Sequence, residues 1–232
     1  AVYAYARSPA PTGDDLQPLV REAVDVIERA LEEHGEEHVA ISFNGGKDCT
    51  VLLHLLAAVL LHLHPTTTTS AAAAPWPPIP SIYVSQPSPF PLMESFVHTS
   101  ETYYTLSLHR TSGLGMKAAL ASYLSLRPQT TAVMVGTRRG DPHGATLEFC
   151  QPTDAGWPVF VRVHPVINWG YADVWKFLRR WEVPYCELYD QGYTSLGSTY
   201  NTHPNPALLS PSGTGFRPAY ELEDESLERA GR

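Results

Sequence analysis

Residues 42–48 (SFNGGKD) form the segment whose residue types most clearly indicate chemistry. Gly45 and Gly46 let backbone N–H groups approach phosphate oxygens, the start of a helix adds partial positive charge, and Lys47 adds a full one. The segment is not a Walker A loop, because Ile41 stands where that motif needs its first glycine and Asp48 where it needs serine or threonine. We predict a phosphate-binding loop here, and the alternative is a tight turn with a surface lysine.

A second pair of charged residues follows a later apolar run. Arg138 and Asp141 come just after residues 130–135, which we predict to be a strand. At the carboxyl end of a strand, a guanidinium can bind phosphate and a carboxylate can bind a ligand hydroxyl or a metal-bound water. The residues alone leave equally open a second interpretation, in which the pair only orders its loop.

The elements that must position these residues alternate along the chain. We predict strands at 38–43, 81–85, 105–109, 130–135 and 160–163, and helices at 16–35, 49–63, 92–104, 114–126 and 171–181. This alternation predicts an α/β fold with a doubly wound, mostly parallel sheet. Ligands bind beyond the carboxyl ends of such strands, so we expect loops 44–48, 85–90 and 136–144 to meet there. On helix 171–181 we expect Trp175 and Leu178 to be core residues.

Length and composition indicate one domain, residues 1–232. The net charge is −8, with 16 Lys and Arg against 24 Asp and Glu, so we expect no nucleic-acid partner and no acidic membrane partner. The three cysteines, Cys49, Cys150 and Cys186, form no CxxC pair, which favours a reducing compartment. We therefore expect a cytoplasmic protein and, by default, a monomer.

Three stretches bear on secretion, membrane insertion and surface insertions: the first 15 residues, the apolar run at 51–63 and the low-complexity run at 64–80. The first 15 residues contain no apolar segment typical of a secretory signal, and the apolar run at 51–63 is shorter than the roughly 20 residues of a membrane span. Residues 64–80 (HPTTTTSAAAAPWPPIP) are rich in proline and of low complexity. We predict a surface insertion at 64–80.

The SFNGGKD segment resembles the pyrophosphate-binding loop of the PP-loop enzymes, or adenine-nucleotide α-hydrolase-like fold, which cleave ATP between its α and β phosphates. The resemblance implies a five-stranded parallel sheet with helices on both faces and Mg-ATP as substrate. It implies that the loop holds the pyrophosphate and that Asn44 and Asp48 are catalytic residues that contact Mg²⁺ or its waters. Backbone groups near Phe43 and Val84 are then expected to contact the nucleobase.

Later segments resemble the eukaryotic FAD synthase (FMN adenylyltransferase) family, in order and in spacing. They are RRGDP at 138–142, QPTDAGWP at 151–158, Arg162, NW at 168–169 and YTSLG at 193–197. The resemblance implies transfer of AMP from Mg-ATP to the phosphate of FMN, giving FAD and pyrophosphate. Here flavin is substrate and product, not a redox cofactor.

The same resemblance implies roles for residues in the second half of the chain. Residues 145–232 are expected to carry flavin-binding segments and a C-terminal extension, and Arg138 is expected to bind phosphate. A carboxylate can accept the imide N–H of the flavin and an indole can cover its ring. The expected flavin contacts are Asp141, Asp154, Trp157 and Arg162, and the expected catalytic residues are Asp141 and the tail arginines Arg229 and Arg232.

Plainer interpretations of these residues stay open. Trp157 is equally well explained as a core aromatic beside Pro158, and Arg162 as an outward-facing charge on its strand. The acidic run at 221–232 is equally well explained as a solvated tail.

Two other functions are alternatives to FAD synthesis. DVWKFL at 173–178 and LYDQGY at 188–193 also resemble the sulfonucleotide (PAPS) reductases. That family requires a nucleophilic cysteine near the C-terminus, and no cysteine follows Cys186. A non-catalytic flavin- or nucleotide-binding module is the second alternative, although Lys47, Arg138 and Asp141 together favour an enzyme.

Overall fold

The computed structural model describes residues 1–9, 12–65 and 76–232. Most of the predicted insertion at 64–80 lies outside these residues, but its end is described and belongs to strand β2 (Ile79–Val84). The predicted insertion therefore extends too far, because Ile79 and Pro80 are part of the sheet. Pro80 is compatible with a strand here, since the ladder between β1 and β2 begins one residue later, at Ser81.

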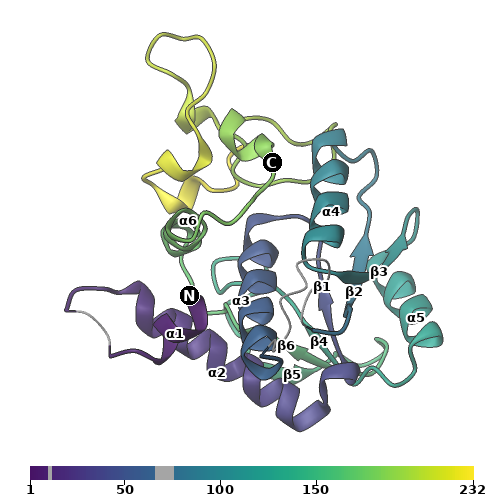
Figure 1. Ribbon diagram of the computed structural model, residues 1–232. Coiled ribbons are helices and arrows are strands. Elements are labelled where there is room, and N and C mark those ends of the chain that lie inside the picture. Colours follow the sequence, from purple (N-terminus) through teal and green to yellow (C-terminus); the bar gives the residue numbers. More distant parts are fainter. Residues whose placement is uncertain (10–11, 66–75) are drawn as a thin grey trace.

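Six strands form one sheet within the described part of the chain, in the order β3-β2-β1-β4-β6-β5 (Figure 1). All neighbouring pairs are parallel except β5 and β6, which are antiparallel. The predicted α/β fold with a doubly wound, mostly parallel sheet is confirmed. Besides β2, the strands are β1 (Val39–Ser42), β3 (Leu106–Thr111), β4 (Ala132–Met134), β5 (Cys150–Pro152) and β6 (Val161–Val163).

Strand β5 was not predicted, and its composition explains why. It has three residues, two of them exposed, and it includes Pro152, so it shows neither alternation nor an apolar run. Its position is set by the partner strand, because Gln151 lies opposite Arg162 of β6. The sheet therefore has one antiparallel edge strand in addition to the five parallel strands that the resemblance implies.

The helices agree with the predicted ones within two residues, apart from one unpredicted short N-terminal helix. Helix α3 begins at Lys47 and not at Cys49, with Gly46 as its N-cap residue. Lys47 and Asp48 are thus in the first helical turn, where amide groups lack a partner within the helix. The helices are α1 (Val2–Arg7), α2 (Leu16–His34), α3 (Lys47–Leu63), α4 (Pro91–Tyr103), α5 (Met116–Leu126) and α6 (Tyr171–Arg180).

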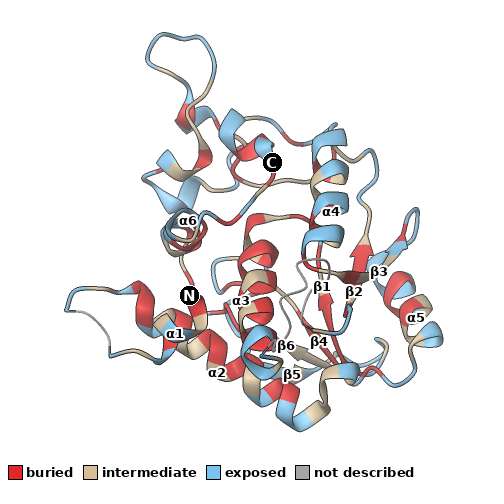
Figure 2. Ribbon diagram, viewed as in Figure 1, coloured by how far each residue is buried: buried red, intermediate tan, exposed pale blue. Residues whose placement is uncertain are grey.

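The two faces of the sheet are covered unequally, as Figures 1 and 2 show. On one side, residues of α1, α2, α3, α4 and α6 form a large apolar core with the sheet, in which α1 and α6 pack on α2 and α3 and in which Trp175 and Leu178 are buried as predicted. The other face carries a smaller cluster, in which Leu120 and Tyr123 of α5 pack on Val133. Among the described residues, α5 is the helix of that second cluster. Leu120, Val133 and Phe160 of the cluster also line a cavity on this face.

Residues beyond α6 contain short 3-10 helices, and the last eight fold back onto the molecule. The carboxylate of Glu225 accepts hydrogen bonds from the backbone N–H groups of Tyr171 and Ala172 at the start of α6, at 3.0 and 2.9 Å. The Asn205 side chain donates to the carbonyl of Leu227 at 2.7 Å. The interpretation of this segment as a solvated tail is therefore wrong, although many of its residues are exposed.

Candidate active site

The three predicted loops meet at one cavity of about 340 Å³, beyond the carboxyl ends of β1, β2 and β4. The strand order changes direction at β1. The strands that follow β1 in sequence, β2 and β3, lie on one side of it, and the later strands β4, β6 and β5 lie on the other. Ligands in doubly wound sheets bind at such a position. The lining residues from the three loops include Asn44, Lys47, Asp48, Gln86, Phe90, Gly136 and Asp141.

The turn between β1 and α3 is fixed by local hydrogen bonds and close packing. The Oδ1 atom of Asn44 accepts hydrogen bonds from the Gly46 N–H and the Cys49 thiol, both at 3.0 Å. Gly45 has a φ of +76°, and a Cβ atom there would lie 2.4 Å from the sulfur of Met93. Glycine is therefore required at position 45 by its conformation and by its neighbours.

Lys47 is not a surface lysine. Its side chain is 2% exposed, and its Nζ atom lies 3.1 Å from Asp48 and 2.5 Å from Glu228. Its backbone N–H donates to the hydroxyl of Tyr189, a buried residue, at 2.9 Å. The alternative interpretation of this segment, a tight turn with an exposed lysine, is therefore wrong.

Arg138 is surrounded by carboxylates and is 3% exposed. Its Nη2 atom donates to both oxygens of Glu228, at 2.6 and 2.7 Å, and its Nε atom lies 2.8 Å from Asp48 Oδ1 without the angle of a hydrogen bond. Burial lowers the pKa of Arg138, but Asp48 and Glu228 outweigh this effect and raise its pKa above the usual value. The guanidinium is therefore always charged.

Asp141 contacts the same guanidinium and also orders its own loop. Its Oδ2 atom accepts a hydrogen bond from the Arg138 N–H at 2.8 Å, and its Oδ1 atom lies 3.6 Å from Arg138 Nη2. Burial raises the pKa of Asp141. Both interpretations of the pair thus describe part of the geometry, because Asp141 stabilises the loop and also lines the cavity.

The folded tail brings two arginines to this cavity. Arg229 Nη1 lies 3.9 Å from Asp141 Oδ1, and Arg232 packs so closely on Gly197 that a Cβ atom at 197 would lie 2.6 Å from the guanidinium. Both arginines line the cavity. Sequence reasoning missed Glu228, which comes with them, because it looks like one more charge of an acidic run.

The two residues expected near a nucleobase differ in their access to the cavity. Val84 lines it, beside Tyr83. Phe43 is fully buried, and its N–H donates to the Ile82 carbonyl at 3.0 Å as part of the sheet. The Phe43 amide is therefore engaged, and Val84 is the better placed of the two.

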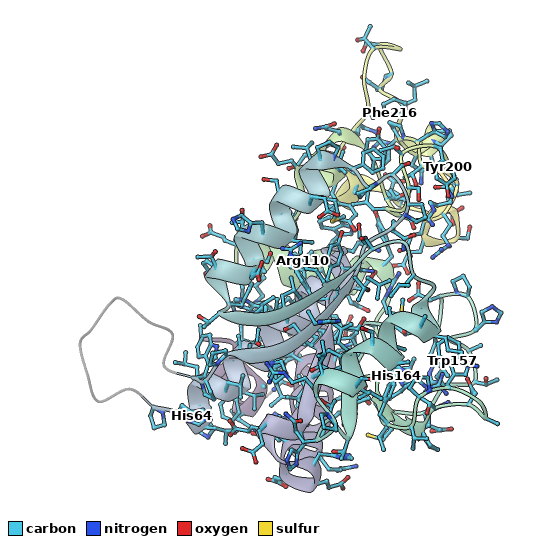
Figure 3. All side chains as sticks on the ribbon, turned by 90° about the vertical axis from the view of Figure 1, so that its right-hand side faces the viewer. His64, Arg110, Trp157, His164, Tyr200 and Phe216 are labelled. Carbon is cyan, nitrogen blue, oxygen red and sulfur yellow. The ribbon has the colours of Figure 1, made fainter. Side chains whose placement is uncertain are left out.

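A second cavity of about 500 Å³ adjoins the first and is lined by Asp154, Trp157 and Arg162, whereas Asp141, the fourth expected flavin contact, lines the first cavity. Trp157 is 38% exposed and lines this cavity, so the core interpretation of Trp157 is wrong. Figure 3 shows Trp157 near the outer edge of the molecule and His164 further inside. Arg162 is half-buried in the same wall, and its Nη2 atom lies 3.2 Å from Asp154 Oδ1, which excludes a purely outward charge.

The residues proposed for Mg²⁺ fit unequally. Within residues 1–9, 12–65 and 76–232, no group of three or more His, Cys, Asp or Glu is arranged to hold a metal ion. The Asn44 Oδ1 atom is engaged by two donors, whereas Asp48 Oδ1 is buried and, among the described residues, has no hydrogen-bond partner but only the ion pair with Arg138 Nε at 2.8 Å. Mg²⁺ often uses one carboxylate together with substrate phosphates and waters. Asp48 fits such a site, and Asn44 fits the role of ordering the turn.

Comparison with known proteins identifies the family. The chain is 42% identical over 217 residues to the probable FAD synthase of Schizosaccharomyces pombe, covering 94% of this chain and 80% of that protein. The chain belongs to the FAD synthase family. It is also 38% identical to the probable FAD synthase of Caenorhabditis elegans, covering 92% of this chain but only 40% of that protein.

A solved structure agrees with this family membership. The FMN adenylyltransferase of Candida glabrata in complex with FAD and inorganic pyrophosphate matches with a TM-score of 0.88 and 26% identity, covering 100% of this chain and 95% of that one. The same enzyme has been solved with FMN and the ATP analogue AMPCPP. In addition, residues 115–204 match the family model of the phosphoadenosine phosphosulfate reductase domain, which reflects the predicted resemblance to that PP-loop group.

Proposed function

We propose that this chain transfers AMP from Mg-ATP to the phosphate of FMN and thereby produces FAD and pyrophosphate. The observation that carries the proposal is the junction of the two cavities, which share Ser42, Val135, Thr137 and Pro142 in their walls. The first cavity offers cations and a helix N-terminus to a polyphosphate, and the second offers an indole and apolar side chains to a flat ring. Ligands in the two cavities would meet at the shared wall.

In this reaction the FMN phosphate attacks the α-phosphorus of ATP in line, and the bond to pyrophosphate breaks. The FMN phosphate is largely dianionic at neutral pH because its second pKa is about 6, so no general base is required. Catalysis then depends on positioning and on neutralising charge. Lys47 and the first turn of α3 would bind the leaving pyrophosphate, while Arg138, Arg229 and Arg232 would compensate its charge.

Magnesium belongs to this proposal as the partner of ATP. When bound, Mg²⁺ would supply positive charge that offsets the charge developing on the phosphate oxygens. Asp48 would hold the ion or its waters, and Asn44 would keep the turn in place. On the flavin side, Asp154 and Arg162 would contact the ring edge and the attached chain, and Trp157 would cover the ring.

The test is to mix the protein with FMN, ATP and Mg²⁺ and to measure FAD by chromatography and pyrophosphate in parallel. We expect equal amounts of the two products, and a fall of at least about a hundredfold in Asp48→Ala. Glu32→Ala, an exposed position on α2, is the matched control. ATP cleavage without FAD would disprove FMN as acceptor. Binding of FMN or ATP, seen as a raised melting temperature without products, would instead favour a binding module.

The reductase alternative is disfavoured by the chemistry of the three thiols. Cys49 and Cys186 are buried, and burial raises the pKa of Cys49 to about 12. Burial also raises the pKa of Cys150 and of Cys186. A nucleophilic cysteine needs a lowered pKa and access to its substrate. The described structure gives none of the three thiols this combination.

The location and the oligomeric state of the protein belong to the same proposal. No helix of the described residues is both long and apolar enough to span a membrane. We propose a cytoplasmic enzyme that acts as a monomer of 25.6 kDa on small-molecule substrates, without nucleic-acid or membrane partners. Size-exclusion chromatography with light scattering tests the monomer, and a mass near twice that value would disprove it.

A further inference from the structure

Glu228 lies between the two buried cations of the phosphate cavity. One of its carboxylate oxygens is 2.5 Å from Lys47 Nζ and 2.6 Å from Arg138 Nη2, and the other is 2.7 Å from Arg138 Nη2. The Glu228 side chain is itself only 14% exposed. A single carboxylate thus bridges both cations, at distances typical of charge-assisted hydrogen bonds.

The backbone around Glu228 is held by contacts that do not involve its side chain. The Thr194 hydroxyl donates to the Glu228 carbonyl at 2.6 Å, and the His203 N–H donates to the Gly231 carbonyl at 2.9 Å. Gly231 is buried, and a Cβ atom there would lie 2.2 Å from the His203 carbonyl oxygen. The position of the tail is therefore determined largely apart from the ion pairs, and the carboxylate can change partners while the backbone stays.

The carboxylate of Glu228 pairs with Lys47 and Arg138 as a negatively charged phosphate oxygen would. Burial raises the pKa of Glu228, but Lys47 and Arg138 outweigh burial and lower it overall, so the group is ionised at neutral pH. Arg138 is almost inaccessible where Glu228 covers it. An incoming anion that pairs with these two cations must therefore displace the carboxylate or share the cations with it.

We propose that Glu228 is an internal counter-ion that competes with pyrophosphate for Lys47 and Arg138 and so weakens the binding of this product. The inference rests on the proposed function, which assigns pyrophosphate to this loop. Without Glu228, departure of pyrophosphate would leave Lys47 and Arg138 with only Asp48 and Asp141 as carboxylate partners among the described residues, and a buried charge that loses a partner is destabilised. Glu228 supplies the replacement partner, and it thereby acts as a positioning residue that promotes product release.

The test measures the binding of pyrophosphate with Mg²⁺ by calorimetry, using no ATP or FMN. Glu228→Gln keeps the size of the side chain and removes its charge. We expect the Kd for pyrophosphate to fall by about tenfold in this variant, because the competing charge is gone. In steady-state assays of FAD formation, the inhibition constant of Glu228→Gln for pyrophosphate should fall in parallel. Glu223→Gln, at an exposed tail position that forms no ion pair or side-chain hydrogen bond with the described residues, should match the unmodified chain.

The outcomes separate this inference from the proposed function. If the unmodified chain binds no pyrophosphate, the assignment of the loop fails. If it binds pyrophosphate and Glu228→Gln binds equally or more weakly, only the counter-ion inference is wrong. Glu228→Asp withdraws the charge by one methylene and should give a smaller fall in Kd. That variant carries the same comparison if Glu228→Gln does not fold, and an unchanged or raised Kd in Glu228→Asp then overturns the inference.

Discussion

At the scale of single residues, the phosphate cavity is an arrangement of charges in which every buried ion has a partner. Arg138 has contacts with Asp48, Asp141 and Glu228, and Lys47 shares two of these three carboxylates. A buried charge without a partner costs several kcal/mol, so these contacts keep the cations ionised and in place. Removal of one carboxylate is therefore expected to change both the turnover number and the free energy of unfolding. The ratio of the two effects depends on which other groups that carboxylate contacts.

Asp141 illustrates this separation. We expect Asp141→Ala to lower the turnover number at least about tenfold, because the variant loses the carboxylate that faces Arg138 and Arg229. Its thermal stability should change little, since one hydrogen bond to the Arg138 N–H contributes only about 1 kcal/mol. Turnover measured by FAD formation, together with a melting curve, checks this prediction. Unchanged activity or a collapse of the fold would contradict it.

Asp141→Asn is the companion variant. Its amide oxygen can still accept the Arg138 N–H, so we expect the stability of the unmodified chain with the low turnover of Asp141→Ala. Normal turnover in Asp141→Asn would show that the hydrogen bond matters and the negative charge does not.

At the scale of elements, the turn between β1 and α3 has a shape that its neighbour α4 enforces. Met93 and Val97 of α4 pack against Gly45, at distances that leave no space for a Cβ atom. The α3 N-terminus is closed in a similar way from the β4 side, where a Cβ atom at Gly136 would lie 2.8 Å from the Cys49 nitrogen. The phosphate loop thus depends on contacts with two separate elements.

We expect Gly45→Ala to destabilise the chain by about 2–4 kcal/mol, since it combines a positive φ with a clash against a methionine sulfur. Gly213→Ala is the matched control, because Gly213 has a similar φ of +73° but nothing within 4 Å of the added atom. The control should cost about 1 kcal/mol for its conformation alone. Unfolding in urea measures both values, and equal losses would mean that the packing of α4 contributes nothing.

At the scale of the whole molecule, the unequal cover of the sheet leaves room for the second cavity. The face that carries α5 also presents Val133 and Phe160, which line that cavity together with Leu120. The large core on the opposite side contains residues of five helices. Two of these, α3 and α4, are joined where His54 Nδ1 lies 2.9 Å from the hydroxyl of Tyr104, the residue that follows α4.

His54 should make the stability of the whole chain depend on pH. Burial lowers the pKa of His54 from 6.5 to about 4, so the unfolded chain takes up a proton between these values while the folded chain does not. Stability is therefore fully present above pH 6.5 and decreases as pH falls towards 4, by at most about 3 kcal/mol. His54→Gln should show a correspondingly shallower dependence in urea unfolding at several pH values.

His98→Gln is the control for this pH dependence. The His98 side chain is 78% exposed, so its replacement should leave the dependence unchanged. An identical pH dependence in the unmodified chain and in His54→Gln would contradict the role of His54.

The sequence by itself determined the order of strands and helices, the loops that carry chemistry and the family, because these depend on local periodicity and on short motifs. Lys47 and Arg138 were singled out in this way as candidate site residues, and Asp154 through the family resemblance. Element ends were less accurate, as at the start of α3, because hydrogen bonding and packing decide where a helix begins.

Only the tertiary structure decided how the tail, the edge strand and the two cavities are arranged. Glu228 looks like a solvated charge until the chain folds back and places it between Lys47 and Arg138. The sequence of strand β5 shows neither alternation nor an apolar run, and the strand is formed by pairing with β6. These features depend on contacts between residues far apart in the chain, and no local pattern of residue types encodes such contacts.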